Sequence, residues 1–325
     1  MKMKQLWLFL AFVFLAACAA PAKNVVLQPA ARDIFSPEEL PQSLINEQIY
    51  WQDRLIYLNG KPVMENDPVR QLWDEMNVVS APIPKFSHNK RYILDRPALG
   101  AKILLWDLET GERKWLAKAG EDLPAGAKIG GMAFMPNDDK VIFSYYTQGG
   151  DNQIAYSDLA LVDIKSGKVE SLKITGFLSD FFELAVSPDG KWAATGMVTL
   201  DDRVCLLVNL ETRSVECLNG EKGWYTSAMF LPDMKHIVYG HNKKIDSPSN
   251  IILSSIDGSE NRVLVSGLTG GGILLVSGGE IVFVGGTYDN PAYDYVYIIN
   301  QDGSDLRRLV YLGGRRITND GPVVP

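Results

Sequence analysis

The sequence predicts an all-β fold, a β-propeller of four-stranded blades, on three observations. From residue 81 onward, short runs rich in Val, Ile, Tyr and Phe alternate with Asp, Asn and Gly turns, a pattern typical of strands in hairpins. One kind of turn recurs every 44 to 51 residues, ending at Arg91, Lys140, Lys191, Lys235 and Glu280. A second kind follows each of these at a similar distance. Each repeat therefore holds four strands, here called a to d, as a propeller blade does.

The first kind of turn joins strands a and b. Its clearest copy is Ser187-Pro188-Asp189-Gly190-Lys191. An Asp or Asn side chain can bond the backbone two residues on, and Gly accepts the positive φ of tight turns. We therefore expect a hairpin turn at each copy.

The second kind of turn joins strands c and d. Its copies lie at residues 107–111, 163–167, 209–213, 256–259 and 301–304. Arg213 stands where the two preceding copies have Gly, so we expect a strained, positive φ at this residue.

These two turns resemble the TolB-type propeller repeat, a relative of the WD repeat. Residues 187–191 match its Ser-Pro-Asp-Gly-Lys sequence, and residues 107–111 match its Asp-x-x-Thr-Gly sequence. The resemblance covers about residues 81–314 and implies the propeller fold. It leaves the function open, because such blades occur in periplasmic scaffolds, in transport accessory proteins and beside peptidase domains.

The two ends of the chain are expected to complete the ring. Residues 47–64 are predicted to form a hairpin that turns at Asn59-Gly60, and residues 321–325 fall where strand a of a further blade would begin. Sharing one blade between the termini leaves no free sheet edge. We thus expect residues 46–325 to form one six-bladed propeller closed by N- and C-terminal strands. The alternative is a five-bladed ring with a separate N-terminal cap.

The N-terminus has the pattern of a bacterial lipoprotein signal peptide. A basic start with Lys2 and Lys4 precedes a twelve-residue apolar run, which ends in Leu15-Ala16-Ala17-Cys18. We expect residues 1–17 to be removed and Cys18 to carry palmitate-like acyl chains, with residues 18–45 as a flexible tether. The resemblance to sorted lipoproteins of Gram-negative bacteria implies the periplasmic side of the outer membrane, because Ala19 stands where their inner-membrane members usually have Asp. The alternative is an ordinary secretory signal cleaved after Ala20.

Charge and motifs exclude several function classes. The formal net charge is −7 and the basic residues adjoin only in scattered pairs, which argues against nucleic-acid binding. The sequence has no Gly-x-Ser-x-Gly, Walker, His-Glu-x-x-His or Cys-x-x-Cys motif, so catalysis is not favoured. Of His88, His236 and His241, only His241 lies in a b–c loop, where a functional role is reasonable. We expect a monomer without a cofactor.

Two cysteines lie on one predicted hairpin. Cys205 and Cys217 flank the turn at residues 209–213, and the periplasm permits disulfides. The register decides between a bridge and two small core residues. Zinc is not expected with so few His and Cys residues.

The longest insertions, residues 147–157, 241–249 and 285–294, all fall in b–c loops and therefore on one side of the ring. Long loops on a rigid scaffold commonly bind partners, and exposed Tyr offers large contact area at low entropic cost. The candidate binding face comprises Tyr145, Tyr146, Asp151, Tyr156, His241, Tyr288, Asp289, Tyr293 and Asp294. Ordinary loop variation is the alternative. The acids could hold Ca²⁺, although no loop has a recognisable ligand spacing.

Two functions follow from this pattern. The first is a lipid-anchored periplasmic scaffold that binds a protein, a peptide or a cell-envelope component without catalysis. The alternative is a glycan-active hydrolase or lyase with two carboxylates about 5–10 Å apart at the channel. Candidates for such a pair are Asp180, Glu183 and Asp320.

Overall fold

The regular structure of the chain is almost entirely β. Within the residues that the computed structural model describes, the 3₁₀ turn η2 (Gln42–Leu44) is the one helical element. These residues are 31–34, 39–44, 48–51, 54–57, 85–96, 100–149, 154–174, 177–178, 184–199, 204–218, 224–243, 247–287, 290–309, 311–312, 315–318 and 321–322.

Three antiparallel sheets follow one another along the chain, and we call them blades one to three. Blade one contains β4 (Lys85–Phe86), β5 (Tyr92–Asp95), β6 (Lys102–Asp107) and β7 (Arg113–Lys118). Blade two contains β8 (Lys128–Phe134), β9 (Lys140–Gln148), β10 (Ile154–Asp163) and β11 (Val169–Ser171). Blade three contains β13 (Leu184–Val186), β14 (Trp192–Thr199), β15 (Val204–Asn209) and β16 (Val215–Glu216). Strand β12 (Phe177–Leu178) pairs with the end of β14 that lies beyond its pairing with β13.

Blades four and five are joined in one eight-stranded sheet. Its strands are β17 (Trp224–Phe230), β18 (His236–Asn242), β19 (Ser249–Ser255), β20 (Asn261–Ser277), β21 (Glu280–Thr287), β22 (Asn290–Asn300), β23 (Arg307–Leu309) and β1 (Arg32–Ile34). Strand β20 pairs with β19 through its first half and with β21 through its second half. It is therefore the last strand of blade four and the first of blade five, where the sequence suggested two separate strands.

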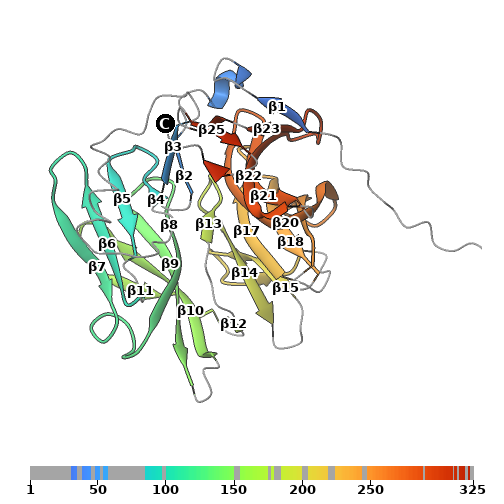
Figure 1. Ribbon diagram of the computed structural model, residues 1–325. Coiled ribbons are helices and arrows are strands. Elements are labelled where there is room, and N and C mark those ends of the chain that lie inside the picture. The colour runs from blue at the N-terminus through green and yellow to red at the C-terminus, as the bar shows by residue number, and fades with distance from the viewer. Residues whose placement is uncertain are drawn as a thin grey trace, which may run out of the picture.

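The sheets are arranged as propeller blades (Figure 1). The first strands of successive blades contact one another, β4 with β8, β8 with β13, β13 with β17 and β17 with β20. Within each blade the strands follow in chain order as antiparallel neighbours. The a–b and c–d turns consequently lie on one side of the blades, the turn side, and the b–c loops lie on the other, the loop side.

The a–b turns have the predicted geometry. In blade three the Ser187 hydroxyl donates to Asp189 and accepts from the backbone of Trp192, and Gly190 has a φ of 74°. Other residues take this position in blades one, two and four, and they also adopt positive φ: Lys90, Asp138 and Met234. The turn thus imposes a left-handed residue even where the sequence lacks Gly.

The c–d turns are also confirmed. Asp107 and Asn209 each accept backbone hydrogen bonds from the residues two and three positions on. Gly111 and Arg213 then take φ values of 74° and 62°. The strained backbone predicted for Arg213 is therefore present.

The core lies between adjacent blades. Because side chains alternate across a strand, Phe143 packs toward blade one and its neighbour Ile142 packs toward blade three. Val238 and Phe283 fill the space between blades four and five. All four side chains are fully buried.

Part of the expected tether is built into the fold, which corrects the interpretation of residues 18–45. Residues 31–34 and 39–44 lie along blade five, and we call them the N-terminal strap. Strand β1 pairs in parallel with β23, and Leu40 and Leu44 are buried against Val282 and Leu309. These two leucines supply the apolar area that a free tether would lack.

Ring closure remains a prediction. Strands β2 (Gln48–Trp51) and β3 (Arg54–Tyr57) form a hairpin in which Trp51 is opposite Arg54, so the turn predicted at Asn59-Gly60 is wrong for this hairpin. At the C-terminus, β25 (Arg315–Thr318) pairs with β24 (Tyr311–Leu312) and β26 (Gly321–Pro322). Among the described strands, these two groups have no pairing with each other.

Candidate functional site

A pair of tyrosines, Tyr145 and Tyr156, lies on the loop side of blade two, where β9 and β10 meet, and we call it the tyrosine pair. Asp158 is opposite Tyr145 in the β9–β10 register, and Tyr156 lies two residues earlier on the same face. The Tyr156 and Tyr145 hydroxyls both donate to Oδ2 of Asp158, at 3.2 and 3.4 Å. The two phenol rings are 6.0 Å apart between centroids. One buried carboxyl group therefore orients two aromatic rings.

Asp158 is fixed from its other side by the end of blade two. Its Oδ1 accepts from the backbone of Leu159 and Ile174, each at 2.8 Å. Its Oδ2 accepts from the backbone of Lys173 at 3.0 Å and from the Ser171 hydroxyl. Asp158 is only 1% exposed, and these bonds offset the cost of burying it. Both oxygens of this carboxyl group are thus already hydrogen-bonded within the protein, and the group is not available to a ligand.

Tyr156 is the exposed member of the tyrosine pair. Its side chain is 44% accessible, whereas Tyr145 is 3% accessible. Burial of its hydroxyl end, the hydrogen bond with Tyr145 and the charge of Asp158 raise the pKa of Tyr156 above its ordinary value. The residue presents a neutral aromatic ring to solvent while its hydroxyl is tied down. A ring held in this way loses little entropy on binding.

Tyr146 is half-buried at the end of β9, near the junction with blade one. Arg96 of blade one reaches across this junction and donates to the carbonyls of Ile129 and Gly130 at 2.5 and 2.8 Å. Gly100 has a φ of 61°, and a Cβ there would lie 2.9 Å from the Ile129 oxygen. Arg96 and Gly100, at the two ends of the b–c loop of blade one, therefore lie closely against Ile129 of blade two, which pairs with Tyr145.

Asp95 is a buried carboxyl group at the end of β5. It is 1% exposed, and its Oδ2 has no hydrogen-bond partner in the described part of the chain. Burial raises its pKa, although the backbone and the charge of Arg96 act in the opposite direction. It is the one carboxyl group among the described residues with a raised pKa, a feature common at catalytic sites.

The histidines do not contribute to the loop-side surface. His241 is 1% exposed, and its ring lies 5.1 Å from that of Tyr225. Its expected exposure in a b–c loop is wrong, because β18 continues through it and pairs it with β19. Tyr145 is buried for the same reason, as a residue within β9.

The remaining predicted site residues lie partly or wholly outside the described residues. Asp151, Tyr288, Asp289 and Cys18 lie outside, as do Asp180, Glu183 and Asp320. Tyr293, Asp294 and Cys205 are described only by the backbone of β22 and β15. Cys217 is disulfide-bonded, and its pairing with Cys205 stays a prediction.

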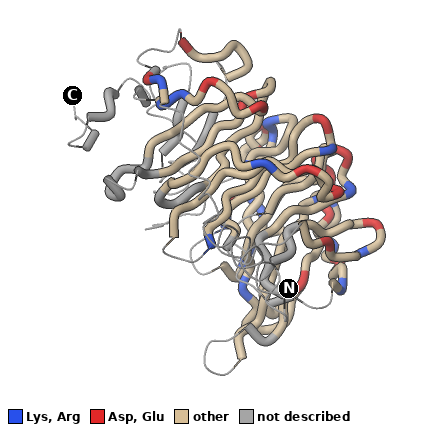
Figure 2. Tube along the Cα trace, turned by 90° about the vertical axis from the view of Figure 1, so that its right-hand side faces the viewer, with Lys and Arg blue, Asp and Glu red and all other residues tan. Residues whose placement is uncertain are grey.

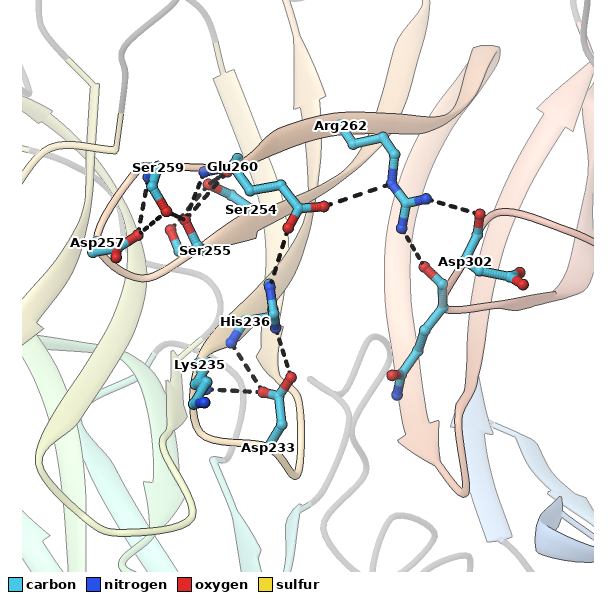
Figure 3. A network of polar contacts seen from close by, with 11 residues as sticks. Asp233, Lys235, His236, Ser254, Ser255, Asp257, Ser259, Glu260, Arg262 and Asp302 are labelled. Carbon is cyan, nitrogen blue, oxygen red and sulfur yellow. Dashed lines mark hydrogen bonds and ion pairs between the residues drawn. The ribbon is translucent and has the colours of Figure 1, made fainter.

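A second polar network lies on the turn side, where it joins blades four and five (Figure 3). Nδ1 of His236 is 2.6 Å from Asp233, and Nε2 is 3.5 Å from Glu260. Arg262 donates to the carbonyls of Asp302 and Gln301 at 2.9 and 2.8 Å. The nearby hydroxyl of Ser255 accepts from the backbone of Glu260. This arrangement connects two blades and does not form a nucleophile–base pair.

Further features limit the chemistry of the described surface. Figure 2 shows charged residues mostly in turns and at strand ends, with both signs interspersed. Over the described ranges, no group of three or more His, Cys, Asp or Glu residues could hold a metal ion. Nor do these ranges include a helix with the length and apolar character needed to cross a membrane.

Comparison with known proteins identifies the fold. No protein-family model and no curated protein matches the chain. A putative TolB from Agrobacterium tumefaciens has a TM-score of 0.54 at 15% identity, over 69% of this chain and 78% of that one. TolB from Acinetobacter baumannii has a TM-score of 0.50 at 17% identity, over 70% of this chain and 56% of that one. The tricorn protease has a TM-score of 0.51 at 18% identity, over 70% of this chain and only 22% of that one. Together with the four-stranded sheets, these likenesses show a TolB-like β-propeller fold.

Proposed function

We propose that the protein is a binding scaffold that captures a protein, a peptide or a cell-envelope component at the loop side of blade two. The supporting observation is Tyr156, an exposed aromatic ring whose hydroxyl is anchored on a buried, fully engaged carboxyl group. Binding energy at interfaces concentrates in such rigid aromatic residues. Tyr146 pairs with Ser157 and lies on the other face of this hairpin, where it would offer a second contact at the same end of the blade.

The same proposal includes the location. The pattern around Cys18 supports removal of residues 1–17, acylation of Cys18 and attachment to the periplasmic side of the outer membrane. We propose also that the protein acts as a monomer without a cofactor. The oxidised state of Cys217 accords with a compartment outside the cytosol.

Catalysis on a glycan is the second candidate, and Asp95 favours it. A buried carboxyl group with a raised pKa suits a general acid. A glycosidase would need a second carboxylate within about 5–10 Å of it. The binding proposal needs no such partner, which is why we rank it first.

The experiment is an affinity capture from detergent-solubilised envelope with the full-length protein and two variants. Tyr156→Ala removes the exposed ring of the tyrosine pair. Trp115→Ala removes an equally exposed ring, 42% accessible, from β7 of blade one. We expect the Tyr156 variant to weaken capture about tenfold or more, as a hot-spot truncation does, and the Trp115 variant to capture normally. Equal capture by the two variants would contradict the proposal. The wild type and an Asp95→Asn variant should then be compared for glycan cleavage.

A further inference from the structure

The N-terminal strap also bears on how an anchored protein faces the membrane. Strand β1 is held on the outer edge of blade five by the register of Arg32 with Arg307 and of Ile34 with Leu309. Asp33 accepts two hydrogen bonds from the Arg308 guanidinium, at 2.7 and 2.9 Å. Such a bidentate pair fixes direction as well as position.

The second half of the strap is attached independently. Leu44 is fully buried and Leu40 is 6% exposed, both in the cluster formed by blade five. The Ser43 carbonyl accepts from the Ser277 hydroxyl at 3.3 Å, at the end of β20. Two sites of attachment, one polar and one apolar, therefore hold the strap to a single blade.

This attachment halves the length of chain that can separate the propeller from an anchor at Cys18. Arg32 lies only 14 positions after Cys18 in the chain, whereas Gln48 lies 30 positions after it. In any conformation, the shorter segment spans at most about 50 Å and the longer one about 100 Å. Strand β1, on the outer edge of blade five, is then the part of the described propeller that follows Cys18 most closely along the chain.

We infer that the strap orients the propeller on the membrane, with the edge of blade five facing the lipid surface and the tyrosine pair of blade two facing away from it. This rests on the anchor in the proposed function. In Figure 1, β1 and β23 lie at the opposite end of the molecule from the β9–β10 hairpin. The orientation keeps Tyr156 accessible to a partner in the periplasm.

Two insertions of the same flexible linker test the inference. The first lies after Asn24, between the anchor and the strap. The second lies after Ile45, between the strap and β2. If the strap is docked, only the first insertion lets blade five move away from the membrane. If residues 19–45 formed one free tether, the two insertions would act alike.

The measurement is energy transfer from a fluorophore at Ser304→Cys, on the exposed turn of blade five, to acceptor-labelled lipid headgroups. A second label position, Gln148→Cys, lies at the far end of β9. We expect stronger transfer from Ser304 than from Gln148, a loss of transfer at Ser304 after the first insertion, and no change after the second. Equal loss from both insertions, or equal transfer from both label positions, would overturn the inference.

Co-flotation with vesicles and partner capture separate this outcome from failure of the proposed function. A full-length protein that does not float lacks the anchor, which overturns the orientation while leaving capture by Tyr156 intact. Conversely, a protein that floats with the expected transfer but fails to capture a partner retains the orientation and contradicts the binding proposal.

Discussion

His88 and Asp138 join the a–b turns of blades one and two. Nδ1 of His88 lies 2.8 Å from Oδ1 of Asp138, which also accepts from the His88 backbone at 2.9 Å. Oδ2 accepts from the backbone of Asn89 at 2.9 Å. Asp138 itself has a φ of 56° and is 8% exposed. A strained turn in one blade thus serves as the acceptor for the turn of the next.

Replacing Asp138 tests the contribution of this joint. Asp138→Asn should lower the free energy of unfolding by about 1–3 kcal/mol, because backbone donors lose a charged acceptor. Urea unfolding measures the difference. Asp139→Asn, at the exposed neighbouring residue, is the matched control and should leave stability unchanged. Equal effects of the two substitutions would show that the joint is not stabilising.

The same joint predicts a pH dependence. Burial acts to raise the pKa of Asp138, but hydrogen bonds from His88 and Asn89 outweigh it and the pKa lies below its ordinary value of 3.8. The associated stability is therefore complete above that value and is lost as the pH falls through the lower pKa of the folded state. The wild type and Asp138→Asn should converge in stability at acid pH. A difference that stays constant down to acid unfolding would contradict this assignment.

The hydrogen bonds of Arg262 should contribute more to the free energy of unfolding than an exposed ion pair does. Arg262→Ala removes two hydrogen bonds from blade four to the carbonyls of Gln301 and Asp302 in blade five, and should cost about 1–2 kcal/mol. Glu170→Ala removes the exposed pair with Arg213 between blades two and three and should cost less than about 1 kcal/mol. Chemical unfolding of both variants checks the order, and the reverse order would refute it.

Alanine substitutions at Gly278 and Gly279 distinguish steric overlap with the strap from strain in the backbone. Both have positive φ, 57° and 90°, so alanine is strained at either. A Cβ at Gly278 would also overlap the Ser43 side chain, whereas one at Gly279 meets nothing within 4 Å. We expect Gly278→Ala to release the second half of the strap, seen as fast hydrogen exchange at the Leu44 amide, which bonds the Pro41 carbonyl. Gly279→Ala should keep that amide protected. Protection in both variants would mean that the strap tolerates the overlap.

The disulfide of Cys217 should stabilise blade three. If its partner is Cys205, the closed loop has about the length for which a disulfide contributes roughly 3 kcal/mol. Mass spectrometry of a non-reduced digest should find the two cysteines in linked peptides, and Cys217→Ser should lower the unfolding midpoint. An unlinked Cys205 peptide would refute the pairing.

The blades could be predicted from sequence because their turns carry local chemistry. Asp107, Asn209 and Ser187 bond backbone groups two to five residues away, and this spacing is visible in a single chain. The strap could not be predicted in this way. Its four-residue spacing of Leu40 and Leu44 gains meaning only from blade five, more than 230 residues later. Its prolines and few aromatic residues suggested a tether instead.

The candidate site was predicted only in part. Tyr146 and Tyr156 were identified because tyrosines cluster near a long b–c loop. The role of Asp158 in orienting the tyrosine pair was not predicted, because its partners Ser171 and Ile174 come from the following hairpin. The burial of Tyr145 was missed because β9 extends further than its turn residues indicate.

Photocrosslinking in intact cells tests most directly whether blade two binds a partner. A photoreactive residue is placed at Tyr156 or Tyr146 on the loop side, with Glu109, an exposed residue in the c–d turn of blade one, as the turn-side control. A binding surface on blade two should give a discrete adduct from the loop-side positions alone, and mass spectrometry of that adduct identifies the partner. No adduct, or equal adducts from both sides, would contradict the claim that blade two presents a binding surface.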